Sequence, residues 1–178
     1  YFLVSSHREE NVDNPQNLKK LLKILTLLAK KYKYPVIFST HPRTKIRLDE
    51  LKISLDKKVK FLKPFSFTDY IKLQNCSKCV LSDSGTITEE SSILGFHALN
   101  IRETHERHEG FEEGSVMLVG LNEERIFQSI SFLEQYEEKN ESLLKTPHDY
   151  LADNVSEKIV RIIPSYIDYV NKYVWHVK

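Results

Sequence analysis

The strongest constraint on the fold is an alternation of short apolar runs with longer segments of helical periodicity. The apolar runs, rich in Val, Ile and Phe, are residues 2–5, 36–39, 59–62, 80–82, 98–101 and 116–119. The helical segments are residues 17–33, 44–53, 67–75, 86–94 and 122–136, with a final helical region at 153–173 in which we expect an interruption near Pro164. This alternation is typical of βαβ units. The sequence therefore predicts an α/β fold with a Rossmann-like parallel sheet flanked by helices.

Length and charge limit the classes of protein to which the chain can belong. Its 178 residues suffice for one domain, because domains commonly hold about 100–200 residues. The 26 Lys and Arg residues nearly balance the 25 Asp and Glu residues, which argues against nonspecific binding to nucleic acid or an anionic membrane. The sequence indicates neither a membrane span nor a secretory signal, so the cytoplasm is the expected compartment. The chain opens inside an apolar run and Met117 is its only methionine, which indicates a piece of a longer protein.

The cysteines and histidines do not form a metal-binding pattern. Cys76 and Cys79 form one C-x-x-C without a second ligand pair at a suitable spacing. A redox pair would open a helix after a strand, whereas Cys79 is expected to open a strand, and both cysteines are expected to fill the core. His105 and His108 do not fit the zinc-protease pattern H-E-x-x-H, and we expect no helix in residues 102–110. We therefore predict no metal and no cofactor.

Polar residues follow four of the predicted strands. His7 and Arg8 come after the first strand, His41 after the second, residues 82–86 after the fourth and residues 102–110 after the fifth. In a parallel sheet these positions share one edge, outside which ligands bind. A purely structural chain could scatter polar loop residues over both edges. The asymmetry therefore favours a binding site.

Residues 82–86, Ser-Asp-Ser-Gly-Thr, lie at a strand-to-helix turn. Unpaired N–H groups and the helix dipole make such a turn suitable for a phosphate or diphosphate. Thr86 and Glu89 also match the S/T-x-x-E capping box, so a purely structural capping role is the alternative. Glu90 is not used by that box, and it is placed to bind two vicinal hydroxyls, as on a ribose.

The other candidates also have structural alternatives. His7 titrates near neutrality and Arg8 offers donors that suit phosphate, but Arg8 could instead pair with a neighbouring glutamate in a solvated loop. His41 either contacts a ligand or is only hydrogen-bonded in place. Residues 102–110 are too polar to be interior, and an arginine there either neutralises a leaving diphosphate or belongs to a charged surface loop.

Aromatic residues recur near the C-terminus at close to helical spacing. They are Tyr166, Tyr169, Tyr173 and Trp175. We expect core or interface residues, because a platform that stacks nucleic-acid bases would need a basic groove beside it.

Several motifs together resemble one family. Residues 6–11 (SHREEN), 39–42 (STHP), 82–90 (SDSGTITEE) and 102–114 match, in order and spacing, the second domain of the non-hydrolysing UDP-N-acetylglucosamine 2-epimerases. The run S-H-R-E-E-N-V-D, with Phe65 and Tyr70, is more similar to the capsule and O-antigen branch. That branch is thought to epimerise UDP-2-acetamido-2,6-dideoxy-L-talose. The resemblance covers roughly residues 2–135.

The resemblance implies a glycosyltransferase-B-like enzyme of two Rossmann-like domains, with a nucleotide sugar in the cleft between them. Residues 1–178 would be the second, UDP-binding domain, and residues 153–178 would pack on the first domain. The expected partners are a UDP-sugar and that first domain, which would supply the acid and base carboxylates. The chain would bind UDP weakly and turn over nothing by itself. A homodimer of the whole enzyme is a further possible partner arrangement.

The resemblance also implies roles for single residues. The catalytic residue would be His7. The residues that bind the UDP-sugar would be Arg8, His41, Tyr70, Ser84, Gly85, Thr86, Glu90, Arg102 and Arg107. Three positions depart from the family pattern: Thr86 replaces a second glycine, Phe65 replaces a polar residue near the base, and His108 replaces a proline. These departures affect the expected sugar specificity more than nucleotide binding.

The implied reaction is inversion at C2 of a UDP-N-acetyl sugar by elimination and re-addition of UDP, in the synthesis of bacterial surface polysaccharide precursors. Removal of the C2 proton needs a carboxylate base, and the leaving diphosphate needs charge stabilisation. Arg8, Arg107 and the helix start at residues 84–86 fit the second requirement. The alternatives are a glycosyltransferase of the same architecture and a non-catalytic nucleotide-sugar binding module.

Overall fold

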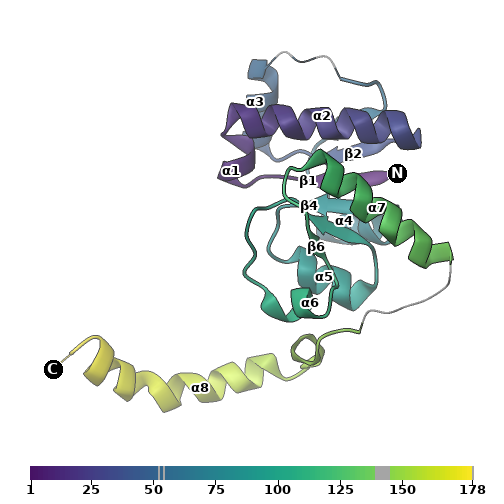
Figure 1. Ribbon diagram of the computed structural model, residues 1–178. Helices are drawn as coiled ribbons and strands as arrows, with labels where there is room; N and C mark the ends of the chain where they lie inside the picture. Colours follow the sequence, from purple (N-terminus) through teal and green to yellow (C-terminus); the bar gives the residue numbers. More distant parts are fainter. Residues whose placement is uncertain (52, 54, 139–144, 178) are drawn as a thin grey trace. The chain divides into compact units, whose positions relative to one another are not determined.

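A parallel sheet is the framework of residues 1–147 in the computed structural model, which describes residues 1–51, 53, 55–138 and 145–177 (Figure 1). Among the described residues, six strands pair in the order β3-β2-β1-β4-β5-β6. They are β1 (Phe2–Ser5), β2 (Val36–Ser39), β3 (Val59–Leu62), β4 (Cys79–Ser82), β5 (Ala98–Asn100) and β6 (Met117–Leu118). Every pairing is parallel, which confirms the predicted α/β fold.

Helices connect the strands and form a separate C-terminal unit. In residues 1–147 they are α1 (Glu9–Val12), α2 (Pro15–Tyr32), α3 (Pro42–Leu51), α4 (Phe67–Asn75), α5 (Ile87–Leu94), α6 (His108–Glu112) and α7 (Glu123–Glu138). The second unit, His148–Lys178, contains a 3₁₀ helix, η1 (His148–Leu151), then α8 (Val155–Tyr169) and a π-helical turn, η2 (Val170–Val174).

The core lies on both faces of the sheet, because successive side chains of a strand point to opposite faces. Phe2 and Val4 of β1 belong to the cluster under α2, α3 and α7 (Figure 1). Leu3, between them, belongs to the opposite cluster with residues of α4, α5 and α6. All three side chains are fully buried. The sheet is therefore covered by helices on both faces.

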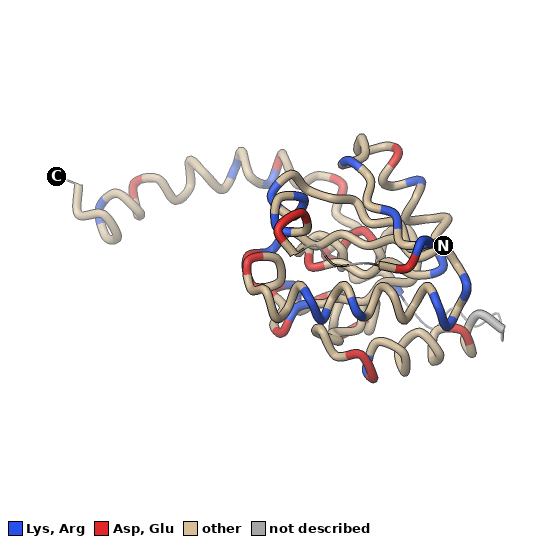
Figure 2. The backbone as a smooth tube through the Cα atoms, turned by 90° about the horizontal axis from the view of Figure 1, so that it is seen from above, with Lys and Arg blue, Asp and Glu red and all other residues tan. Residues whose placement is uncertain are grey.

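Helix α2 shows how local sequence sets an element. The Asn14 side chain accepts hydrogen bonds from the N–H groups of Gln16 and Asn17, and Pro15 occupies the first turn. The leucines at helical spacing are buried against the sheet, namely Leu18, Leu21, Leu22, Leu25 and Leu28. Lysines occupy the other face. Over residues 1–147 basic and acidic residues are interspersed, in keeping with the small net charge (Figure 2).

The strand order reverses beside β1. The chain moves outward from β1 to β2 and β3, returns to β4 on the other side of β1, and continues to β5 and β6. Neighbouring connections therefore leave β1 and β4 toward opposite sides, and in open parallel sheets ligands bind outside the carboxyl ends of two such strands. The residues that follow β1 and β4 meet at this point.

Two local expectations differ from the structure, one short helix was not predicted, and two residues of predicted helical segments are not described. α8 runs through Pro164 without a break, because proline removes one N–H···O bond while the bonds around it persist. α6 forms where residues 102–110 were expected to contain no helix. α1 was not predicted, since four residues carry too little periodicity. Residue 52 of the predicted helix 44–53 and residue 178 of the C-terminal region lie outside the described residues.

The aromatic residues of the second unit are not core residues of this chain. Tyr166, Tyr169, Tyr173 and Trp175 are all exposed. They contact one another in part, with ring centroids of Tyr169 and Tyr173 5.3 Å apart. Their expected role as interface residues stays a prediction. No helix in the described part of the chain is both long and apolar enough to span a membrane.

Candidate functional site

A buried carboxylate joins the loops that follow β1 and β4. Asp83, directly after β4, is fully buried. Its side chain accepts hydrogen bonds from the N–H groups of His7 and Arg8, at 3.0 and 3.1 Å. It also accepts from Ser6 Oγ at 2.7 Å and Asn11 Nδ2 at 3.1 Å. Because hydrogen bonds to a buried charge are strong, this carboxylate fixes the backbone that carries His7 and Arg8.

Two histidines lie close together at this edge. His7 Nδ1 is 3.3 Å from Asp83 Oδ1, and the His7 side chain is half exposed. The ring centroids of His7 and His41 are 6.4 Å apart. His41 is exposed, and its Nδ1 accepts the N–H of Arg43. The structure thus brings both predicted histidines to one place, with His7 oriented by a carboxylate.

Arg8 lies beside the start of α5. A Cβ placed on Gly85 would be 3.9 Å from Arg8 Nη2, so the guanidinium faces this glycine. Among the described residues, the buried Nε of Arg8 has no hydrogen-bond partner. The neighbouring glutamates are used elsewhere, because Glu9 pairs with Arg43 and Glu10 lies 3.4 Å from Arg102. The expected alternative, in which Arg8 pairs with one of them, is not what the structure contains.

The capping box predicted at α5 does not form. Thr86 occupies the N-cap position, but its side chain makes no capping hydrogen bond. Its Oγ1 donates to Glu90 Oε1 at 2.6 Å instead, and Glu89 Oε1 accepts from Arg107 Nε at 2.7 Å. Both side chains of the predicted box thus bind other partners, although the buried Oε2 of Glu89 has no hydrogen-bond partner among the described residues. The helix start is consequently open to an anion.

Glu90 and Tyr70 continue the site toward α4. Glu90 Oε2 accepts a hydrogen bond from Gln74 Nε2 at 2.5 Å. Burial raises the pKa of Tyr70 to about 12, the charges of Glu90 and Asp83 act in the same direction, and a hydrogen bond with Ser5 opposes them. The Tyr70 phenol is therefore neutral at physiological pH and keeps its O–H as a donor.

One arginine of the loop after β5 is more buried than expected. Arg102 is 7% exposed, whereas most of residues 102–110 are exposed or half-buried, in keeping with the expectation that the segment is too polar to be interior. The burial is tolerated because Arg102 Nη2 donates to Glu106 Oε1 at 3.1 Å and Nε lies near Glu10. The hydrogen bond and the charge of Arg102 hold the pKa of Glu106 below its usual value; desolvation opposes them, and the charges of Arg8 and Arg107 make smaller contributions in the same direction as Arg102. Arg102 thus ties its own loop to α1.

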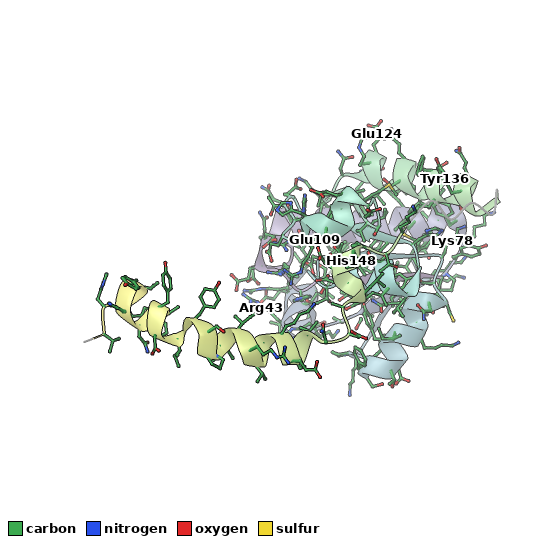
Figure 3. All side chains as sticks on the ribbon, turned by 90° about the horizontal axis from the view of Figure 1, so that it is seen from below. Arg43, Lys78, Glu109, Glu124, Tyr136 and His148 are labelled. Atoms are coloured by element: carbon green, nitrogen blue, oxygen red, sulfur yellow. The ribbon has the colours of Figure 1, made fainter. Side chains whose placement is uncertain are left out.

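All ten predicted site residues lie at the carboxyl edge of the sheet or on the first turns beyond it. They follow β1 (His7, Arg8), β2 (His41), β4 (Ser84, Gly85, Thr86, Glu90) and β5 (Arg102, Arg107), and Tyr70 belongs to α4. Arg43, which is labelled in Figure 3 and follows His41 closely in the sequence, forms ion pairs with Asp13 and Glu9.

Sequence reasoning missed the residues that hold the site together. Asp83 was noted only as part of a motif, and its role follows from burial. Asn11 donates both to Asp83 and to the Ile101 carbonyl, at 3.1 and 3.2 Å, which links α1 to the ends of β4 and β5. Gln74 had no signal, because a glutamine on an amphipathic helix is normally exposed. Tertiary contacts alone identify these three residues.

The possible metal ligands, the cysteines and a surface hollow do not add to this site. Among the described residues, no group of three or more His, Cys, Asp and Glu side chains could hold a metal ion. Cys79 is buried at the start of β4 as expected, but Cys76 is exposed, so it does not fill the core. The hollow lined by Lys20, Leu121 and Phe127, between α2 and the start of α7, contains none of the predicted site residues.

Comparisons with known proteins point to one family. The family model described as UDP-N-acetylglucosamine 2-epimerase matches residues 1–164. A curated UDP-N-acetylglucosamine 2-epimerase of Methanocaldococcus jannaschii is 36% identical over 137 residues, which cover 75% of this chain and 37% of that protein.

Solved structures agree with this match. The UDP-N-acetylglucosamine 2-epimerase structure from Rickettsia bellii is 46% identical with a TM-score of 0.81, over 99% of this chain and 47% of that one. The Methanocaldococcus jannaschii structure, in complex with UDP-GlcNAc and UDP, is 34% identical with a TM-score of 0.80, over 93% of this chain and 45% of that one. The chain spans less than half the length of each of these relatives.

Proposed function

Because the chain belongs to the UDP-N-acetylglucosamine 2-epimerase family, we propose that residues 1–178 form the UDP-binding half of an enzyme that inverts C2 of a UDP-N-acetyl amino sugar. The observation that carries the proposal is the contact of Arg8 with Gly85 at the point where the strand order reverses, next to Thr86, which binds Glu90. Nucleotide ligands bind at such a point in open parallel sheets. A relative of the same fold is described in complex with UDP-GlcNAc and UDP.

In this proposal the UDP moiety extends from the start of α5 toward α4. The diphosphate lies against Ser84, Gly85 and Thr86 at the start of α5, where the helix dipole favours negative charge. Arg8 contributes a buried Nε that has no hydrogen-bond partner among the described residues, and Arg107 contributes a half-exposed guanidinium. An unsatisfied donor of Arg8 and the positive charge of Arg107 beside an open helix start suit a diphosphate.

The nucleoside lies further along, toward α4. Glu90 binds the ribose hydroxyls, because a carboxylate accepts two hydrogen bonds from a vicinal diol. Tyr70 borders the uracil, with its ring packed beside the buried cluster under α4 and α5. His41 lies beside His7 and faces the sugar end of the substrate.

The reaction proceeds by elimination and re-addition. A base removes the C2 proton, its electron pair forms the C1–C2 double bond, and the C1–O bond breaks to release UDP. UDP then adds back to C1 while a proton is delivered to the opposite face of C2. The residues described here stabilise the departing diphosphate by preorganised positive charge. His7, oriented by Asp83, is the catalytic residue of this half, and a first domain supplies the acid and base carboxylates.

The finer assignment is also a proposal. The S-H-R-E-E-N-V-D motif favours the branch that acts on UDP-2-acetamido-2,6-dideoxy-L-talose, in the cytoplasmic synthesis of surface polysaccharide precursors. Residues 153–178 pack on the first domain, since their many exposed apolar side chains need a partner surface. Whether the enzyme is a homodimer depends on surfaces of that domain as well.

The test has two stages. Titration of this chain with UDP in a calorimeter should show weak binding, and incubation with UDP-GlcNAc in deuterated water should leave the C2 proton in place by NMR. A longer protein that carries residues 1–178 behind a first domain should exchange C2–H for deuterium as it forms the epimer. Epimer without deuterium at C2 contradicts the mechanism, and absence of UDP binding contradicts the role of this domain.

A further inference from the structure

The Glu90 carboxylate is held from two directions. Gln74 Nε2, from α4, donates to Oε2 at 2.5 Å, and Thr86 Oγ1 donates to Oε1 at 2.6 Å. A carboxylate has about four lone-pair sites, two on each oxygen. One site on each oxygen is therefore used, and one on each is left. The two remaining sites lie on the two oxygens of one fixed plane, which is the arrangement that a pair of neighbouring hydroxyls requires.

In the described part of the chain the Gln74 side chain makes one hydrogen bond, the one to Glu90. Its side chain is fully buried, yet among the described residues its Oε1 has no hydrogen-bond partner. A buried amide with one unsatisfied end lowers stability compared with an apolar side chain of the same shape. Its orientation is set by Glu90, because the reversed amide would point Oε1 at a carboxylate oxygen. The one bond that this amide makes to Glu90 therefore explains its presence better than packing does.

Thr86 connects the same carboxylate to the loop at the start of α5. Its Oγ1 is 3.1 Å from Ser84 Oγ. Since the single hydroxyl proton of Thr86 is donated to Glu90, Ser84 is the donor of that second bond. A continuous chain of hydrogen bonds thus runs from Ser84 through Thr86 and Glu90 to Gln74. Thr86 stands where the family resemblance implies a second glycine, which could not make these bonds.

We propose that Gln74 and Thr86 are positioning residues that fix Glu90 for the ribose diol and so set the preference for a ribonucleotide over a deoxyribonucleotide. The inference rests on the proposed function, in which Glu90 binds the ribose of UDP. Gln74 need not touch the nucleotide for this effect, and the Thr86 hydroxyl acts on the ribose through Glu90, in addition to the place of Thr86 against the diphosphate. Each removes rotational freedom that Glu90 would otherwise lose on binding.

Calorimetry with UDP and 2′-deoxy-UDP tests the inference. The unaltered chain should bind UDP about tenfold more tightly than 2′-deoxy-UDP, since a hydrogen bond to a charged group is worth about that factor. In Gln74→Met this ratio should fall at least about threefold, with UDP binding weakened and 2′-deoxy-UDP binding little changed. In Thr86→Val, which also alters the surface against which the diphosphate of both nucleotides lies, the ratio should fall by a similar factor. Thr86→Ser keeps the hydroxyl and should keep the ratio.

The outcomes separate the inference from the function on which it rests. Gln74→Met removes the unpartnered oxygen at similar volume and Thr86 is exposed, so both variants should keep the unfolding temperature of the unaltered chain. UDP binding with an unchanged ratio in both variants overturns the inference alone. So does an equal loss for both nucleotides, which indicates a structural role. Failure of the unaltered chain to bind UDP counts against the proposed function and the inference together.

Discussion

The Asp83 carboxylate accepts the backbone N–H of His7 at 3.0 Å, and this contact joins two loops that are 76 residues apart in the sequence. Both groups belong to residues that follow neighbouring strands, β1 and β4, which pair in register. A fully buried carboxylate is costly unless donors surround it. Here backbone and side-chain donors from residues 6–11 do so. The geometry of His7 and Arg8 therefore depends on a carboxylate that is itself fully buried.

Replacement of Asp83 should destabilise the fold. In Asp83→Asn one carboxylate oxygen becomes an NH₂ group that faces N–H donors, so we expect a loss of about 3 kcal/mol in the free energy of unfolding. Urea denaturation followed by circular dichroism measures it. Asp49→Asn is the matched control, because Asp49 is 63% exposed and its ion pair among the described residues is with Lys45 of its own helix. Equal losses in the two variants would show that the Asp83 network does not stabilise the fold.

Arg107 should contribute to binding of the diphosphate. Arg107→Ala removes a guanidinium beside the start of α5, and we expect the affinity for UDP to fall by about 1–3 kcal/mol. Binding of uridine, which has no phosphate, should not change. Calorimetry or ligand-observed NMR gives both values. Arg125→Ala, on the exposed surface of α7, removes the same charge and should leave UDP binding as it was. An unchanged affinity in Arg107→Ala would remove this residue from the site.

The order of helices and strands could be predicted because the burial of each element leaves its own pattern of apolar residues in the sequence. Each strand is a short apolar run, and the leucines of α2 recur at the spacing of one helix face, so sequence periodicity reports directly on the core. Element ends were less accurate. The strand predicted at 98–101 ends at Asn100, and the run at 116–119 contributes only Met117 and Leu118. Hydrogen bonding to neighbouring strands, which no local pattern encodes, sets those ends.

The sequence predicts at which edge of the sheet the candidate site lies, but not which side chains contact one another there. The polar clusters follow parallel strands, and parallel strands end at the same edge of a sheet, so their shared edge could be predicted. The partners of each side chain were not predictable. Thr86 and Glu89 match a capping box, yet they bind Glu90 and Arg107, because residues from other loops compete for them. Likewise, Arg102 is buried because Glu106 and the distant Glu10 surround it.

Two glycines should respond differently to alanine. Gly95 ends α5 with φ +76°, a left-handed conformation that costs an L-residue about 1 kcal/mol. Gly95→Ala should therefore lower the free energy of unfolding by about that amount. A Cβ on Gly85 would meet only Arg8 Nη2 at an ordinary 3.9 Å, so Gly85→Ala should leave stability unchanged within about 0.5 kcal/mol. Its methyl group should nevertheless weaken UDP binding. Comparison of urea midpoints tests the two stability expectations. A larger loss of stability in Gly85→Ala than in Gly95→Ala would contradict them.

The pair of Arg102 and Glu106 should make stability depend on pH in the acid range. The hydrogen bond and charge of Arg102 lower the pKa of Glu106 from its usual 4.5 in the folded chain. A carboxyl whose pKa is lower in the folded state stabilises the fold above its unfolded pKa, and this contribution is lost as the pH falls through the folded pKa. Glu106→Gln should therefore be less stable than the unaltered chain at pH 7, with a difference that shrinks as the pH falls below 4.5. Urea denaturation at a series of pH values measures this, and Glu124→Gln on α7 corrects for the effect of the same substitution at an exposed site. A difference between Glu106→Gln and the unaltered chain that persists undiminished at low pH would mean that the ion pair is not its cause.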